Sequence, residues 1–173
     1  MADFMGRAIG ALKLQPAIYE EVEADKSATV QALAVVVISS VAAGIGISHA
    51  TTPVSLLVGA LAALFGWLIW ATLTYIIGAR LLPEPQTQSD VGELLRTTGF
   101  ASAPAIFHLF ARLPLIGTIV SFAVSIWMLV AMVIAVRQAL DYKSTGRAVG
   151  VCLIGWLVYI GVAALLGNTA QLY

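Results

Sequence analysis

Charge is scarce in this chain. Of its 173 residues, 10% are charged and 60% are hydrophobic, whereas a soluble globular domain carries about 25% charged residues. No Asp, Glu, Lys or Arg occurs between Lys26 and Arg80. So long a stretch without charge excludes a soluble domain and predicts an integral membrane protein.

Residues that carry chemistry are also few. The single cysteine, Cys152, has no partner for an internal disulfide. No Asp or Glu lies inside an expected span, which disfavours a proton-coupled transporter because such proteins use a buried carboxylate. The sequence has no HExxH motif, no GxSxG motif and no phosphate-binding glycine loop. We therefore expect no enzyme, no metal site and no cofactor, and the formal net charge of zero gives no indication of nucleic-acid binding.

What the chain does contain is a series of long apolar runs. They predict an all-α integral membrane protein with five transmembrane helices, at about residues 30–48, 54–82, 94–112, 115–136 and 148–167. Residues 30–173 then form one five-helix transmembrane domain, and residues 1–29 form a cytoplasmic N-terminal segment.

The N-terminal segment has two features of its own. Apolar residues recur at helical spacing in Phe4–Leu12, which predicts a short amphipathic helix on the membrane surface; a partly ordered tail is the alternative. Glu20, Glu21, Glu23 and Asp25 follow. These acids form either a solvated helix face or a docking patch for a basic partner.

The third span, residues 94–112, is the weakest of the five. Only Thr97–Ala111 is without charge. As an α-helix it would cover about 22 Å, less than the hydrocarbon core of about 30 Å. Pro104 interrupts it, but Arg96 and Arg112 bracket it and can reach opposite headgroup layers.

The distribution of basic residues favours a crossing by this segment. If all five segments cross, every lysine and arginine except Arg112 lies on one side of the membrane. If the third segment does not cross, Arg137, Lys143 and Arg147 move to the other side. Because basic residues collect in cytoplasmic loops, we expect five crossings, a cytoplasmic N-terminus and a C-terminus outside.

Small residues repeat every four positions in three spans. These stripes allow helices to approach closely, either within the bundle or in contact with another copy or another membrane protein. They consist of Ser40, Gly44 and Ser48, of Ser55, Gly59 and Ala63, and of Gly117, Ser121 and Ser125.

His108 and Arg112, with Arg96, are the candidates for a polar lining or a ligand site. Four residues apart, His108 and Arg112 would share a face of an α-helix. The alternative is a histidine satisfied near the membrane interface, beside an arginine that reaches for headgroups. A lone histidine can also ligate a metal or a porphyrin magnesium, but no second ligand lies nearby in the sequence. His49, at the mouth of the first span, is most simply an interface residue.

The four tryptophans lie well inside the expected spans rather than at interfacial positions. We interpret them as packing residues between helices; contact with a lipid, a sterol or a pigment is the alternative. They are Trp67, Trp70, Trp127 and Trp156.

Several short motifs together suggest a family. Gly99-Phe100 is followed by Pro104 in the third span, Ile126-Trp127 and AVRQAL (residues 135–140) lie in and after the fourth, and PAIYEEVEAD (residues 16–25) precedes the first. This pattern resembles the YIP domain family of Ypt/Rab-interacting membrane proteins over about residues 15–165. The resemblance implies five spans with a glycine-aromatic pair and a proline in the third.

The resemblance limits what can be expected of function. Eukaryotic members act in vesicle trafficking and carry a DLYGP motif, which is missing from this chain, so a Rab-binding role is not expected. The short form is similar to prokaryotic members, which implies a location in a prokaryotic inner membrane.

Two functions remain open. The first is a non-enzymatic scaffold or accessory subunit that associates with itself or other membrane proteins, in contact with membrane lipids. The second is a transporter-like protein that passes a lipid or small solute through the bundle, because broken helices line cavities in transporters. A cavity beside Pro104 would favour passage, and a fully packed interior would favour the scaffold.

Overall fold

The computed structural model describes residues 3–47 and 52–169, and within these ranges every regular element is a helix. The elements are α1 (Phe4–Leu12), α2 (Pro16–Ala24), α3 (Ala28–Gly46), α4 (Pro53–Tyr75), η1 (Ile76–Leu81), α5 (Val91–Ala101), η2 (Ala103–Arg112), α6 (Gly117–Ala139) and α7 (Thr145–Thr169). The predicted all-helical class is confirmed.

Three helical stretches are long and apolar enough to cross a membrane: Ala28–Gly46, Pro53–Leu81 and Gly117–Ala139. Thr145–Gly161 of α7 is a shorter apolar stretch. These helices support the expected membrane location, and they correspond to four of the five spans that the sequence predicts.

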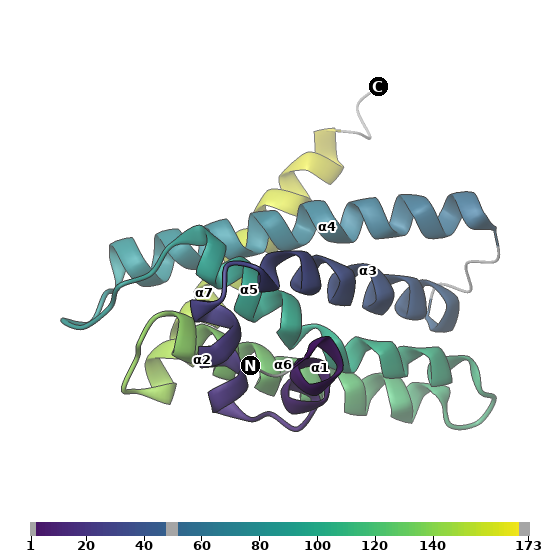
Figure 1. The fold of residues 1–173 in the computed structure, drawn as a ribbon. Coiled ribbons are helices and arrows are strands. Elements are labelled where there is room, and N and C mark those ends of the chain that lie inside the picture. Colours follow the sequence, from purple (N-terminus) through teal and green to yellow (C-terminus); the bar gives the residue numbers. More distant parts are fainter. Residues whose placement is uncertain (1–2, 48–51, 170–173) are drawn as a thin grey trace.

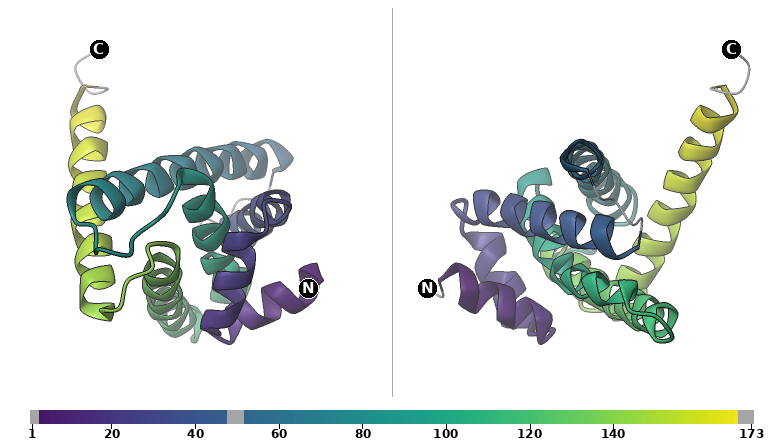
Figure 2. Two further views of the ribbon diagram at one scale, coloured as in Figure 1. Left: turned by 60° about the vertical axis from the view of Figure 1, so that its left-hand side comes forward. Right: turned by 90° about the vertical axis from the view of Figure 1, so that its right-hand side faces the viewer.

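The long helices form a bundle in which α3 and α4 are in contact and run in opposite directions across Figure 1, while Figure 2 shows that their axes are inclined to each other. Helix α5 leads directly into η2 along the chain, and both contact α3 and α6. In Figure 1, α1 is seen nearly end-on where the long helices run across the picture, so α1 lies across the bundle. Figure 2 shows that α7 diverges from the other helices toward its C-terminal end.

The third segment is not the single α-helix expected over residues 94–112. It is an α-helix up to Ala101 and a 3-10 helix from Ala103. Pro104 has no N–H to donate to a carbonyl four residues earlier, and its ring would clash with an α-helical turn. The chain instead makes tighter turns, beginning with the bond from the Ala105 amide to the Ser102 carbonyl at 2.9 Å.

The second span also changes its winding at its end, where η1 is a π-helix. Here the Tyr142 hydroxyl lies 2.9 Å from the carbonyl oxygen of Gly78 and 2.7 Å from that of Leu82. A Cβ atom on Gly78 would lie 2.3 Å from the Leu140 side chain. The wide turns of the π-helix η1 therefore occur where Leu140 and Tyr142, which follow α6, pack closely against it.

The two polar loops, residues 82–90 and 140–144, are in direct contact. Thr87 Oγ1 donates to the Leu140 carbonyl at 2.9 Å, and the Lys143 amide donates to Glu84 Oε2 at 3.1 Å. Arg147 also lies 3.7 Å from the Glu84 carboxylate. The stretch from α5 to α6 therefore begins and ends at the same end of the bundle.

The glycine-aromatic pair in α5 has a packing role. Phe100 is fully buried, and a Cβ atom on Gly99 would lie 2.7 Å from the Ala32 Cβ and 3.1 Å from the Trp67 ring. Gly99 therefore lets α5 approach α3 and α4 more closely than any larger residue would allow. This contact positions the start of η2 against α3.

We predict that Gly99→Ala destabilises the protein by about 1–3 kcal/mol, because the added methyl group overpacks the contact with Ala32 and Trp67. Gly150→Ala is the matched control, since a Cβ atom there meets no atom within 4 Å. It should be neutral or slightly stabilising in a helix. Thermal unfolding in mild detergent measures both, and equal midpoints for the two variants would contradict the packing role.

Candidate functional site

A cavity of about 640 Å³ lies between α3, α4, α6, α7 and the α5–η2 segment. Its volume falls within the range of small-molecule sites, about 300–1,000 Å³. Ser102 and Ala105, which flank Pro104, line it. The cavity is therefore beside the break in the third segment, the place where a cavity is expected to favour passage over a fully packed scaffold.

Two of the predicted small-residue stripes form part of its walls. Ser40 and Gly44 contribute from α3, and Gly59 and Ala63 contribute from α4. At Gly59 a Cβ atom would meet nothing within 4 Å, so this position faces open space instead of a packed helix. Ser55 is exposed, and Ser48 lies outside the described residues, as does His49.

Trp67 and Trp70 of α4 line the cavity and hydrogen-bond to neighbouring helices. Trp67 Nε1 lies 3.1 Å from the Leu95 carbonyl oxygen and 3.2 Å from Thr98 Oγ1. Trp70 Nε1 donates to Met132 Sδ at 3.3 Å, and the small Gly155 of α7 faces the Trp70 ring. Both tryptophans therefore pack between helices, as predicted.

The other two tryptophans differ from each other. Trp127 donates from Nε1 to the Leu12 carbonyl at 3.0 Å and stacks on Phe107 with ring centroids 5.3 Å apart. It is a packing residue that joins α6 to α1 and η2. Trp156 is 55% exposed and lines the cavity.

His108 lies in the cavity wall at the point where η2 meets the end of α3. A Cβ atom on Gly46 would lie 1.7 Å from the His108 carbonyl oxygen, so the backbone of η2 lies directly against the end of α3. His108 itself is 6% exposed, and among the described residues neither ring nitrogen has a hydrogen-bond partner. The backbone of Ala105 and Ser121 is close enough to influence the imidazole electrostatically, but it makes no hydrogen bond of normal geometry with either nitrogen.

The structure does not bring His108, Arg112 and Arg96 together. The predicted shared face of His108 and Arg112 is wrong: His108 is buried and Arg112 is exposed at the end of η2. In a 3-10 helix, residues three apart share a face and residues four apart do not. Only His108 of the three lines the cavity.

Arg96 lies in α5, at the opposite end of the third segment from Arg112, and binds backbone carbonyls of α2. It is 5% exposed, and its Nε lies 3.0 Å from the carbonyl oxygens of both Val22 and Glu23. Its NH2 also donates to the Glu23 carbonyl. A guanidinium group on the last carbonyls of α2 fixes that helix end to α5.

The third small-residue stripe, on α6, is used within the bundle at its start. A Cβ atom on Gly117 would lie 2.1 Å from the Ala111 carbonyl oxygen, so α6 begins in close contact with the end of η2. Ser121 is half-buried, and Ser125 is exposed and donates from Oγ to the Ser121 carbonyl at 2.8 Å.

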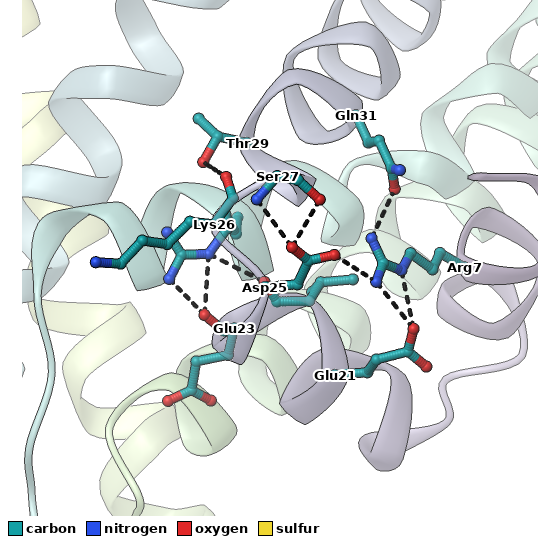
Figure 3. A network of polar contacts seen from close by, with 10 residues as sticks. Arg7, Glu21, Glu23, Asp25, Lys26, Ser27, Thr29 and Gln31 are labelled. Atoms are coloured by element: carbon teal, nitrogen blue, oxygen red, sulfur yellow. Dashed lines mark hydrogen bonds and ion pairs between the residues drawn. The ribbon is translucent and has the colours of Figure 1, made fainter. Parts of the chain in front are cut away.

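A polar network fastens the N-terminal helices to the bundle. Figure 3 shows Arg7 of α1 reaching Glu21, Asp25 and Gln31. Arg7 is 2% exposed and donates to Glu21 Oε1 at 3.0 Å, to Asp25 Oδ2 at 2.7 Å and to Gln31 Oε1 at 3.0 Å. Hydrogen bonds from Ser27 and Arg7 lower the pKa of Asp25 to about 2.

The acidic residues of α2 are therefore mostly engaged inside the protein. Glu21 and Asp25 pair with Arg7, and Glu20 accepts from Gln138 Nε2 at 2.6 Å. The side chain of Glu23 points away from Arg7 (Figure 3). Burial and the nearby carboxylates of Asp141 and Glu93 raise the pKa of Glu23 to about 8.

Among residues 3–47 and 52–169, no three His, Cys, Asp or Glu side chains lie close enough together to hold a metal ion.

Pro104, the third residue of the sequence motif, is fully buried. The close contact at Gly46 is not indicated by the α3 stripe, because Gly46 falls between two of its positions; the run GIG at residues 44–46 is the signal for it in the sequence.

The family model for the Yip1 domain matches residues 10–166 of the chain. The match spans nearly the whole chain, including the α5–η2 segment and its motif. Comparisons with curated proteins and with solved structures found no match. The chain therefore belongs to the Yip1 domain family, as its resemblance predicted.

We predict that stability falls as the pH rises from about 4.5 toward 8. A raised pKa means that folded Glu23 holds its proton over this range while the unfolded chain has lost it, so the folded state loses stability as pH increases. Glu23→Gln should flatten this slope, with the larger gain in unfolding temperature at pH 8 than at pH 5. Glu20→Gln is the control, and the same slope in wild type and Glu23→Gln would refute the assignment.

Proposed function

We propose that this Yip1 family protein is a five-span membrane protein that acts without catalysis by holding an apolar molecule of the bilayer in its cavity. The observation that carries the proposal is a ligand-sized cavity, lined by small and aromatic residues, beside a broken helix. In transporters such broken helices line the substrate site. Of the two functions left open by the sequence, the cavity favours the passage of a lipid or small solute.

Contact between the polar loops supports five crossings. The loops at residues 82–90 and 140–144 share hydrogen bonds, so they lie on one side of the membrane. Since α6 is long enough to cross by itself, the α5–η2 segment must cover the same distance in the opposite direction. Arg112 lies at the far end of this segment, apart from the other basic residues.

The 3-10 winding of η2 makes the third span longer than an α-helix of the same residues would be. With about 1.5 Å per residue in α5 and about 2.0 Å in η2, Thr97–Ala111 covers about 27 Å. That is close to the hydrocarbon core of about 30 Å. Together with the distribution of basic residues, this length supports a cytoplasmic N-terminus and a C-terminus outside, in a prokaryotic inner membrane.

Association with another membrane protein is the second candidate. One specific observation favours it: Ser55 and Gly59 of α4 are exposed, and small residues spaced by four are typical of helix–helix contacts. A helix of a partner, or of a second copy, would then cover this face.

Labelling of single cysteines tests the five crossings. In a Cys152→Ser background, Gln88→Cys and Ser144→Cys should react with a membrane-impermeant maleimide from the same side of the membrane. Leu115→Cys, in the turn between η2 and α6, should react from the other side. Leu115 is 99% exposed, so a cysteine at this position is accessible to the reagent. Labelling of Gln88→Cys and Ser144→Cys from opposite sides would contradict the crossing of the third segment.

A double substitution tests the use of the cavity. Gly59→Leu with Ala63→Phe places two larger side chains in the cavity wall, so the purified protein should retain markedly less lipid through delipidation in detergent. The matched control is Gly150→Leu with Ile154→Phe, four residues apart on α7 and outside the cavity wall. Native mass spectrometry counts the bound lipids, and circular dichroism checks the fold.

Retention of lipid equal to wild type in the cavity double variant would rule out the cavity as the binding site. A change from dimer to monomer in this variant, without loss of lipid, would instead support association through α4. Both outcomes are visible in the same mass spectrum.

A further inference from the structure

Three side chains in the cavity wall carry hydrogen-bonding groups that no described residue engages: Ser39 of α3, and Trp156 and Tyr159 of α7. Ser39 is 3% exposed, and the surface that stays open lies in the cavity wall. A buried hydroxyl without a hydrogen bond is costly, above all in a membrane, where water cannot supply the partner. Ser39 is therefore a point at which a bound molecule gains a hydrogen bond.

The other polar side chains of the wall are already engaged. The hydroxyls of Ser40, Thr98 and Ser102 donate to carbonyls in the preceding turn of the chain. The indole groups of Trp67 and Trp70 donate to neighbouring helices. Both ring nitrogens of His108 are closed off by the protein around them, so a molecule in the cavity cannot reach them. The capacity of the cavity side chains to bind a polar ligand group therefore belongs to the three free groups.

The free groups lie near the middle of the bilayer. The Tyr159 hydroxyl is 3.8 Å from where a Cβ atom on Gly66 would lie, so it reaches across the cavity to α4. Gly66 is next to the middle residue of the apolar stretch Pro53–Leu81, and Ser39 lies close to the middle of α3. A ligand that uses these groups must hold a polar group inside the hydrocarbon, and this group must be uncharged because a charge there is expensive. The charged headgroup of a phospholipid or a fatty acid stays at the membrane surface and does not meet this requirement.

The chemistry of the wall limits the ligand further. An indole N–H only donates, and a hydroxyl of serine or tyrosine can donate. The three groups together therefore suit oxygen atoms that accept, such as those of carbonyl groups. The rings of Trp67 and Trp70 and the thioether of Met128 offer apolar contacts that suit a flat, unsaturated ring.

We propose that the cavity binds the ring of a membrane quinone, a planar carbonyl compound with an apolar tail, whose carbonyl oxygens accept hydrogen bonds from Tyr159 and Ser39. The ring would lie between the aromatic side chains of α4 and α7. Trp156 and Tyr159 are 55% and 41% exposed, so the α7 side of the cavity is open to the bilayer, where the tail would remain. This inference rests on the proposed function of the cavity and adds the class of ligand and the groups that select it.

The experiment compares two probes that differ only in their carbonyl groups. Delipidated protein is titrated with decylnaphthoquinone and with decylnaphthalene substituted at the same ring position, and native mass spectrometry measures both affinities. A hydrogen bond in a dry site corresponds to about a tenfold difference in affinity. The wild type should therefore bind the naphthoquinone about tenfold more tightly than the naphthalene.

Removal of the two hydroxyls tests which groups select the ligand. Tyr159→Phe with Ser39→Ala keeps the shape of the wall, so this variant should bind the two probes equally. Tyr75→Phe with Ser125→Ala is the matched control, because both of these hydroxyls lie outside the cavity wall, and it should keep the wild-type preference. An unchanged preference for the naphthoquinone in the Tyr159→Phe and Ser39→Ala variant would overturn the assignment of the selecting groups.

Failure of this inference is distinguishable from failure of the proposed function. Equal affinity of the wild type for both probes, with both lost in the Gly59→Leu and Ala63→Phe double variant, would overturn selection by carbonyl groups but leave the proposed function standing. Binding of neither probe, while that double variant still loses lipid, would overturn the quinone alone. Binding of neither probe, with wild-type retention of lipid in the double variant, would overturn both.

Discussion

The missing N–H of Pro104 is the constraint on which the rest of the structure depends. It prevents the third segment from continuing as an α-helix, and the chain responds with ten residues of 3-10 helix. A 3-10 helix is longer and thinner than an α-helix of the same number of residues. The third segment is thereby longer than it would be as an α-helix, which is what the proposed crossing requires.

A thin helix can also lie closer to its neighbours where they have no side chain. Gly46 receives the backbone of η2 at His108, and Gly117 receives its end at Ala111. Gly99 does the same for α5 before the break. These contacts hold the broken segment in place, because neighbouring helices can satisfy or shield backbone groups that would otherwise be exposed to lipid.

The same geometry explains why a cavity remains beside the segment. The small residues of α3 and α4 that face it leave space which η2, with three residues per turn, does not fill. His108 is buried in that wall because its neighbours at three-residue spacing, Ala105 and Ala111, lie on the same side of η2. The proposed function follows from this largely apolar cavity beside a broken helix.

Much of this fold could be predicted from the sequence, because long uncharged runs directly indicate long apolar helices. The four strong spans lie within a few residues of α3, α4 with η1, α6 and α7. The motif of Gly99, Phe100 and Pro104 was also identified, although its packing was not.

What could not be predicted depends on the winding of η2 and on contacts between distant segments. Assuming an α-helix placed His108 and Arg112 on one face, whereas three residues per turn separates them. The partners of Arg7 and Arg96 come from other helices, so their burial has no signal in local sequence. Gly46 was overlooked because a close approach of two backbones depends on where the second backbone lies.

A nitroxide scan of residues 103–112 in proteoliposomes tests the central claim most directly, since it reports both the depth and the winding of the broken segment. Ile106 and Leu109 are 39% and 44% exposed, while Ala105 and His108 are 5% and 6% exposed. The account predicts minima of oxygen accessibility three residues apart and a depth that passes steadily toward the side of Arg112. Minima at a spacing of 3.6 residues, or a depth that returns to the side of the polar loops, would contradict it.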